Sequence, residues 1–176
     1  MNFTKTLSEI AGFFEENELR YALIGGLALA AYGHARSTLD IDLAVERDQQ
    51  DRIIEFMESR GFETLHRSEG YSNHQHGDPV LGHVDFVYVR GETADRLFGE
   101  TTQFDGPGGR SIPVPKPEHL IAMKVLAMKN DSERTLQELA DIRVLMARPK
   151  VDRQEVRRYF ERHDLLERFD ELDRSL

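Results

Sequence analysis

The most informative part of the chain for its architecture is residues 21–45, YALIGGLALAAYGHARSTLDIDLAV. The apolar run at 21–24 predicts a strand, Gly25-Gly26 indicates a tight turn, and the Ala- and Leu-rich residues 27–32 favour a helix. A second strand is expected at 41–45. A Gly pair between a strand and a helix lets a phosphate approach backbone N–H groups at the start of that helix. The pair is therefore a candidate phosphate site, although Gly pairs also form ordinary turns.

Asp40 and Asp42 are two residues apart at the start of the strand expected at 41–45, so their side chains should share one face. Two carboxylates placed so close repel each other unless a cation lies between them. Hard oxygen ligands of this kind suit Mg²⁺. The alternative is a solvent-facing acidic edge, but Ile41 and Leu43 make the opposite face apolar.

Residues 84–89, VDFVYV, carry the strongest strand signal in the chain, and they include Asp85. An Asp in such a run is costly to bury without a partner. If this strand lies beside the strand at 41–45, Asp85 completes a cluster of three carboxylates, which can hold two Mg²⁺ and act on a phosphoryl centre. The alternative is an exposed Asp on an edge strand.

The remaining pattern predicts an α/β or α+β core followed by a helical tail. Helices are expected at 3–17, 49–60 and 93–98, a strand at 62–66, a loop at 67–82, and a hairpin from 101–104 and 111–114. The tail should hold at least three helices, at 118–129, 133–147 and 152–173, the last broken near His163-Asp164. The Pro-rich segment 113–117 places a domain boundary between residues 1–115, a catalytic core, and residues 116–176, a helical region packed on that core.

Charge and composition narrow the function. The 176 residues carry a formal charge of −9, with 10 basic and 19 acidic residues in 1–115 and 13 of each in 116–176. This excess argues against binding nucleic acid by bulk charge. The absence of Cys excludes disulfides, thiolate nucleophiles and Cys-bound metals. No apolar run of membrane-spanning length and no signal peptide pattern are present, so a cytoplasmic protein without a membrane partner is expected.

The order strand, Gly-Gly, helix, Asp-x-Asp and a later strand Asp resembles the nucleotidyltransferase superfold shared with DNA polymerase β. The thirteen residues between Gly26 and Asp40 fit the long end of that family's spacing. Residues 31–45, with PKPEHLIAMKVLAM (115–128) and LADIRVL (139–145), are similar to AbiEii-type toxins of toxin–antitoxin pairs and their small uncharacterised relatives. The resemblance covers residues 20–145 and implies a mixed sheet flanked by helices, with a C-terminal helical extension.

The resemblance also implies roles for single residues. Asp40, Asp42 and Asp85 would be catalytic and would hold two Mg²⁺ or Mn²⁺ ions, and the NTP would be bound by Gly25, Gly26, Arg36, Thr38 and Lys124. Other roles are open for two of these residues: Arg36 could pair with the aspartates, and Lys124 could be a solvated helix residue. Asp141 matches a family acid whose role, catalytic or structural, the sequence leaves open. Gln137-Glu138 departs from the Lys-Asp pair of close toxin relatives.

Three histidines, His74, His76 and His83, fall in or beside the loop expected at 67–82. Such histidines are expected to be solvated. A His-x-His pair can also bind a transition metal, which leaves a metal-dependent hydrolase as a further alternative.

The resemblance implies transfer of a nucleoside monophosphate from an NTP to an acceptor hydroxyl or phosphate, with release of pyrophosphate. The acceptor could be tRNA, a protein or a small molecule, and a toxin would have a cognate antitoxin. The alternatives are an antibiotic-modifying nucleotidyltransferase and a non-catalytic nucleotide-binding or regulatory protein. A tRNA acceptor would need basic surface, and the tail offers Arg153, Arg157, Arg158 and Arg162. Acidic residues are interleaved with these arginines, which favours ordinary ion pairs.

Overall fold

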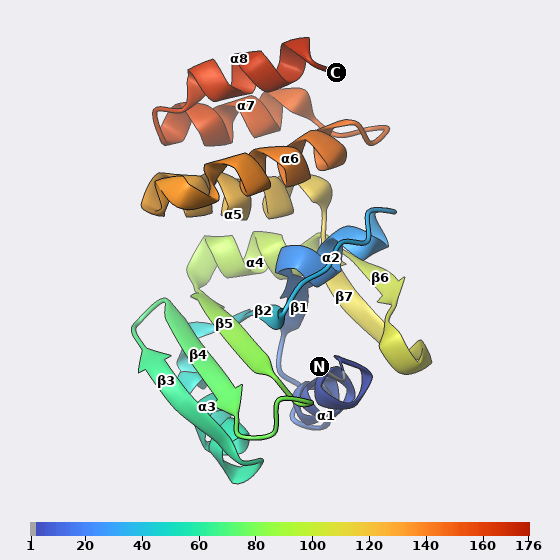
Figure 1. Ribbon diagram of the computed structural model, residues 1–176, viewed down its shortest axis with the longest axis vertical. Coiled ribbons are helices and arrows are strands. Elements are labelled where there is room, and N and C mark those ends of the chain that lie inside the picture. The colour runs from blue at the N-terminus through green and yellow to red at the C-terminus, as the bar shows by residue number, and fades with distance from the viewer. Residues whose placement is uncertain (1–2) are drawn as a thin grey trace. The chain divides into compact units, whose positions relative to one another are not determined.

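The computed structural model describes residues 3–176 of the chain (Figure 1). The chain divides into two compact units, Met1–Pro115 and Lys116–Leu176. The division falls inside the Pro-rich segment 113–117, where proline restricts the backbone of its own residue and of the one before it.

A five-stranded mixed sheet forms the centre of the first unit (Figure 1). Its strands, in the spatial order β1-β2-β5-β4-β3, are β1 Tyr21–Ile24, β2 Asp40–Glu46, β5 His83–Val89, β4 Tyr71–His76 and β3 Phe62–Arg67. The neighbours β2 and β5 run parallel, and the other pairs are antiparallel. The mixed sheet expected from the sequence is confirmed, and it makes β2 and β5 internal strands.

One face of this sheet is buried beneath two helices, α1 Phe3–Glu16 and α3 Gln50–Ser59. The ring of Phe14 lies 6.3 Å from that of Phe86 on β5, and Phe13 stacks on Phe56 at 4.0 Å, so the helices also contact each other. Buried side chains alternate with half-exposed ones along β5 and the first half of β2, and the half-exposed face carries Asp40, Asp42, His83 and Asp85. This half-exposed face carries the candidate site.

The rest of the first unit consists of short elements that agree with the sequence pattern. Helix α2 begins directly at the Gly pair, α4 follows β5, and the expected hairpin is present; the bounds are α2 Gly25–Ala31, α4 Gly91–Gly99, β6 Thr101–Asp105 and β7 Ser111–Pro115. Short 3₁₀ turns lie at Arg47–Gln49 and Pro107–Gly109.

The second unit is entirely helical, with α5 Pro117–Asn130, α6 Thr135–Met146, α7 Arg153–Arg162 and α8 Leu166–Arg174, and a 3₁₀ turn at Ser132–Arg134. Pro117 lies in the first turn of α5, where a missing N–H costs nothing. The Asp152 carboxylate accepts hydrogen bonds from the backbone of Gln154 and Glu155 and so caps α7. The expected break near His163 is real, because Asp164 adopts a φ of 60° between α7 and α8.

The loop expected at 67–82 is wrong for residues 71–76, which form strand β4. Glycines and a proline surround this segment and suggested a loop. The strand forms because it is hydrogen-bonded on both sides, to β3 and to β5, and this pairing supplies the stability that its polar sequence lacks.

In the described part of the chain, none of the helices has the length and apolar character that a membrane span requires.

Candidate active site

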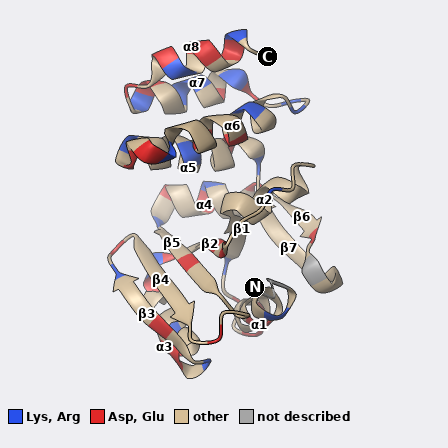
Figure 2. Ribbon diagram, viewed as in Figure 1, with Lys and Arg blue, Asp and Glu red and all other residues tan. Residues whose placement is uncertain are grey.

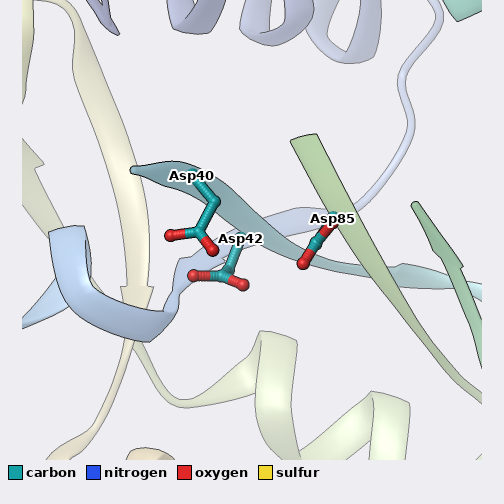
Figure 3. A group of neighbouring side chains, drawn as sticks. All are labelled: Asp40, Asp42 and Asp85. Atoms are coloured by element: carbon teal, nitrogen blue, oxygen red, sulfur yellow. The ribbon is translucent and has the colours of Figure 1, made fainter. Parts of the chain in front are cut away.

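Three aspartates meet on the half-exposed face of the sheet (Figure 3). Asp40 and Asp42 project from β2, and Asp85 projects from the adjacent strand β5, directly opposite Asp42 in the strand register. One carboxylate oxygen of each lies within 4.8 Å of the others. Both strands are internal, so the alternative of an exposed edge-strand Asp is wrong for Asp85. Asp40 and Asp42 are half-exposed, and the choice between metal ligands and a solvent-facing acidic pair stays a prediction.

Gly25 packs directly against the second of these aspartates. The residue has a φ of 64°, in the left-handed region where a side chain is strained. A Cβ at this position would lie 1.9 Å from the Asp42 Oδ2 atom, too close for any side chain. Glycine is therefore required here for two reasons, the backbone turn and the space that the Asp42 carboxylate occupies.

Gly26, Arg36 and Thr38 gather beside the same cluster. A Cβ on Gly26 would lie 3.0 Å from the Thr38 Cβ and 3.1 Å from the Arg36 Nη1 atom. The Thr38 hydroxyl donates a hydrogen bond of 2.6 Å to the Asp40 carboxylate. The structure thus brings together the nucleotide-binding residues predicted in the first unit, and both roles considered for Arg36 stay predictions.

Asp85 has partners on its other side, from β4. The Asn73 amide donates a hydrogen bond to the Asp85 carboxylate, and the Tyr71 hydroxyl interacts with the same group. Burial raises the pKa of Asp85, against the opposing effect of these two donors. Burial, followed by the neighbouring Asp85 carboxylate, raises the pKa of Tyr71, so its hydroxyl keeps its proton and remains a donor.

Lys124, in the second unit, is buried among acidic side chains of the same unit. Its Nζ atom lies 2.8 Å from Glu138 and 2.6 Å from Asp141. Arg134 also contacts Glu138, at 2.7 Å. The alternative of a solvated helix residue is therefore wrong for Lys124, and Asp141 has at least a structural role as its partner. Triphosphate binding by Lys124 stays a prediction.

The three histidines do not form a metal site, and one of them is not solvated. His74 is fully buried, with its ring nitrogens beside the Ser72 and Thr64 hydroxyls at 2.9 and 3.2 Å. Burial lowers the pKa of His74 to about 4. His83 lies on the half-exposed face of the sheet with Asp85, opposite the face in which His74 is buried. Within residues 3–176, the three aspartates are the one group of three or more His, Cys, Asp or Glu side chains that could hold a metal ion. A histidine-metal hydrolase has no support.

Asn73 and Tyr71 are the site residues that sequence reasoning missed. They lie in the segment expected to be a loop, and no hydropathy pattern marks YSNHQH (residues 71–76) as a strand. Their proximity to Asp85 follows from the pairing of β4 with β5. The one available signal was the length of the predicted loop, since long loops in compact domains are uncommon.

The geometry is suited to phosphoryl chemistry. A Gly-Gly turn packed against an Asp-x-Asp strand, with a third Asp on the adjacent parallel strand, combines a close backbone approach with a cluster of hard oxygen ligands. A mixed sheet with this arrangement defines the nucleotidyltransferase class.

The chain belongs to a family described as uncharacterised nucleotidyltransferases, whose match extends over residues 1–171. No curated protein matches the sequence. The family and the fold together make the chain a nucleotidyltransferase, and the resemblance to AbiEii-type toxins stays a prediction.

Solved structures share the fold at low sequence identity. The antibiotic-resistance factor ANT(2'')-Ia is 15% identical with a TM-score of 0.70, over 99% of this chain and 98% of that one. The lincosamide antibiotic adenylyltransferase LnuA, bound to lincomycin, is 18% identical with a TM-score of 0.55, over 81% and 96%. The Thermotoga maritima protein TM1012, described as a "putative nucleotidyltransferase", is 15% identical with a TM-score of 0.56, over 79% of this chain and 92% of that one.

Proposed function

We propose that this chain transfers a nucleoside monophosphate group from an NTP to a hydroxyl of a small-molecule acceptor, at the site formed by Asp40, Asp42 and Asp85. The observation that carries the proposal is the gathering of these carboxylates beside the Gly25-Gly26 turn. The family and the fold support the reaction class.

The donor set fits divalent cations. Three carboxylates with oxygens within 4.8 Å of one another repel strongly without a cation between them, and Mg²⁺ and Mn²⁺ prefer such oxygen ligands. We therefore propose that Asp40, Asp42 and Asp85 hold two such ions. When bound, these ions neutralise the charge that develops on the phosphoryl group.

The roles of the protein's own residues follow from this assignment. Asp85 accepts the proton of the acceptor hydroxyl as its oxygen bonds to the α-phosphorus, the bond from that phosphorus to the β-phosphate bridging oxygen breaks, and pyrophosphate leaves. Gly25 and Gly26 admit the triphosphate close to the backbone. Arg36 and Thr38, which lie against Gly26, are placed to orient it. Lys124 as a further triphosphate ligand, and residues 1–115 as the catalytic core, are parts of the same proposal.

Charge favours a small-molecule acceptor over a nucleic acid. Residues 1–115, which carry the site, hold 19 acidic and 10 basic residues. Proteins bind polyanions through Lys and Arg contacts to phosphates. Basic and acidic residues are interspersed along α7 and α8 (Figure 2), and Arg153 and Arg168 are paired with Asp173 and Glu171. The acidic excess of residues 1–115 repels a polyanionic acceptor, whereas a neutral or cationic acceptor is not repelled.

The names of two structural neighbours also favour a small-molecule acceptor. ANT(2'')-Ia has been captured with adenylyl-2''-tobramycin, and LnuA with lincomycin. The sequence resemblance predicted a toxin that modifies tRNA or protein and has a cognate antitoxin. Transfer of label to RNA or protein would be needed to support that prediction.

The test is incubation of the purified chain with each α-³²P-labelled NTP and Mg²⁺, in the presence of total RNA, total protein, a metabolite extract, or a panel of aminoglycosides and lincosamides. We expect label in a small-molecule fraction and its loss when the metal is chelated. Label in RNA or protein would support the toxin prediction and contradict the small-molecule acceptor. A chain that binds NTP without transferring label to any fraction would be the non-catalytic alternative.

Two isosteric variants separate the site from the rest of the acidic surface. Asp42→Asn removes one charge from the cluster and should abolish transfer while the chain remains folded by circular dichroism. Asp48→Asn makes the same chemical change at an exposed position and should retain full activity. Full activity in Asp42→Asn would refute the assignment of the site.

A further inference from the structure

Asp85 occupies the middle of a row of three polar side chains that crosses three strands. The strand register pairs Asp42 on β2 with Asp85 on β5, and it pairs Asp85 with Asn73 on β4. Directly opposite residues in neighbouring strands project on the same face. Asp85 therefore has a carboxylate on one side, which repels it, and an amide on the other side.

The amide is bonded to Asp85. The Asn73 Nδ2 atom donates a hydrogen bond to the Asp85 Oδ1 atom, and the hydroxyl of Tyr71, two residues earlier on the same face of β4, also interacts with this carboxylate. Asn73 and Tyr71 are both half-buried. A polar group that leaves water is expensive unless it is hydrogen-bonded, so these contacts restrain the rotation of the Asp85 side chain.

The hydrogen bonds from β4 act on the Asp85 carboxylate in the same direction as its repulsion from Asp42, and they fix where that movement ends. Without a cation between them, the Asp42 and Asp85 carboxylates repel each other, and a freely rotating Asp85 would move away from β2 (Figure 3). A carboxylate has about four lone-pair positions over its two oxygens. Donors on the β4 side can therefore hold the group while lone pairs remain for a ligand on the β2 side.

We propose that Asn73, assisted by Tyr71, is a positioning residue that holds the Asp85 carboxylate in the orientation required to complete the three-aspartate metal site. This inference rests on the proposed function. It assigns a role in that function to strand β4, which contributes no carboxylate to the cluster.

The experiment compares Asn73→Leu and Tyr71→Phe with the control Gln75→Leu. Gln75 is on the same strand and the same face, it carries the same amide, and it lies opposite His83 rather than Asp85. Binding of Mn²⁺ to the folded protein is measured by electron paramagnetic resonance without nucleotide. NMP transfer to an acceptor found active with the wild type is measured separately.

Removal of a side chain that orients a metal ligand typically costs 10–100-fold in metal affinity or activity. We expect Asn73→Leu to weaken Mn²⁺ binding and to lower kcat by factors in that range, and Tyr71→Phe to do so by about tenfold. The KM for NTP should change little. Gln75→Leu should match the wild type in both measurements. A purely structural role would lower the melting temperature and leave the Mn²⁺ affinity of the folded protein unchanged.

A second background tests whether the effect passes through Asp85. In Asp85→Asn, the further change Asn73→Leu should alter Mn²⁺ binding by less than about twofold, because the group that Asn73 positions is already impaired. Should Asn73→Leu fail to fold, Tyr71→Phe, which removes one hydroxyl, carries the same comparison.

The outcomes separate the two proposals. A wild-type chain that binds Mn²⁺ and transfers NMP, with Asn73→Leu and Tyr71→Phe indistinguishable from it, overturns the positioning role alone. So does an equal effect of Asn73→Leu in the wild-type and Asp85→Asn backgrounds. A wild-type chain that neither binds Mn²⁺ nor transfers NMP overturns the proposed function and, with it, this inference.

Discussion

Substitution of Gly25 by alanine adds a Cβ atom that is unfavourable for two separate reasons, the backbone conformation and the space that Asp42 occupies. The residue has a φ of 64°, and the added Cβ would lie 1.9 Å from the Asp42 Oδ2 atom. An L-residue in the left-handed region costs roughly 1–2 kcal/mol. Ordinary contact begins at 3.4 Å, so the Asp42 carboxylate must retreat by about 1.5 Å.

The displacement should be expressed mainly in activity. A misplacement of about 1 Å at a reacting centre can cost about 100-fold in rate. We therefore expect Gly25→Ala to lose at least about 100-fold in NMP transfer and to weaken Mn²⁺ binding. Its unfolding free energy should fall by about 1–2 kcal/mol from the backbone alone. Activity is measured with labelled NTP, and stability by urea denaturation followed by circular dichroism.

Two glycines serve as matched controls. Gly91 also has a positive φ, of 55°, but a Cβ there would meet nothing within 4 Å, so Gly91→Ala should lose similar stability and keep its activity. Gly26 has no positive φ, and its nearest would-be contacts are 3.0–3.1 Å, so Gly26→Ala should be the milder change of the Gly pair. If Gly25→Ala were as active as the wild type, or if Gly91→Ala lost as much activity, the packing of Gly25 on Asp42 would have no functional weight.

Two further predictions concern stability. Burial lowers the pKa of His74 to about 4 against 6.5 in an unfolded chain, so the unfolded state binds more protons between these values, and the stability that neutral His74 contributes is lost as the pH falls from 6.5 to 4. The difference in unfolding free energy between the wild type and His74→Gln should shrink by about 2–3 kcal/mol from pH 7 to pH 4.5 in urea titrations, and a difference independent of pH would contradict this. Lys124→Met leaves Glu138 and Asp141 buried without their ammonium partner and should cost about 3–5 kcal/mol at pH 7. Lys129→Met, on the exposed side of the same helix, should change stability by less than about 0.5 kcal/mol in the same urea assay.

Much of the fold and part of the site could be predicted from local pattern. The strand–Gly-Gly–helix unit, the Asp-x-Asp strand and the VDFVYV strand are visible because side-chain alternation and glycine's backbone freedom are properties of adjacent residues. The same alternation assigned Asp40 and Asp42 to one face. Any strand with this alternation places Asp40 and Asp42 on one face, whichever strands become its neighbours.

The remaining features depend on which strands become neighbours. The pairing of β5 between β2 and β4 gives Asp85 two contrasting neighbours, Asp42 and Asn73. Strand β4 itself forms because both of its edges are hydrogen-bonded, although its sequence is polar.

The environment of single groups has the same origin. His74 contacts Thr64, which is 10 positions away in the chain, and Lys124 contacts Glu138 and Asp141, which are 14 and 17 positions away. Sequence spacing carries no information about such contacts, because hydrogen bonds, desolvation and ion pairing depend on distance in space. The sequence by itself therefore determined the Gly-Gly turn and the shared face of Asp40 and Asp42. The surroundings that orient Asp85 and keep His74 neutral exist only once the sheet is assembled.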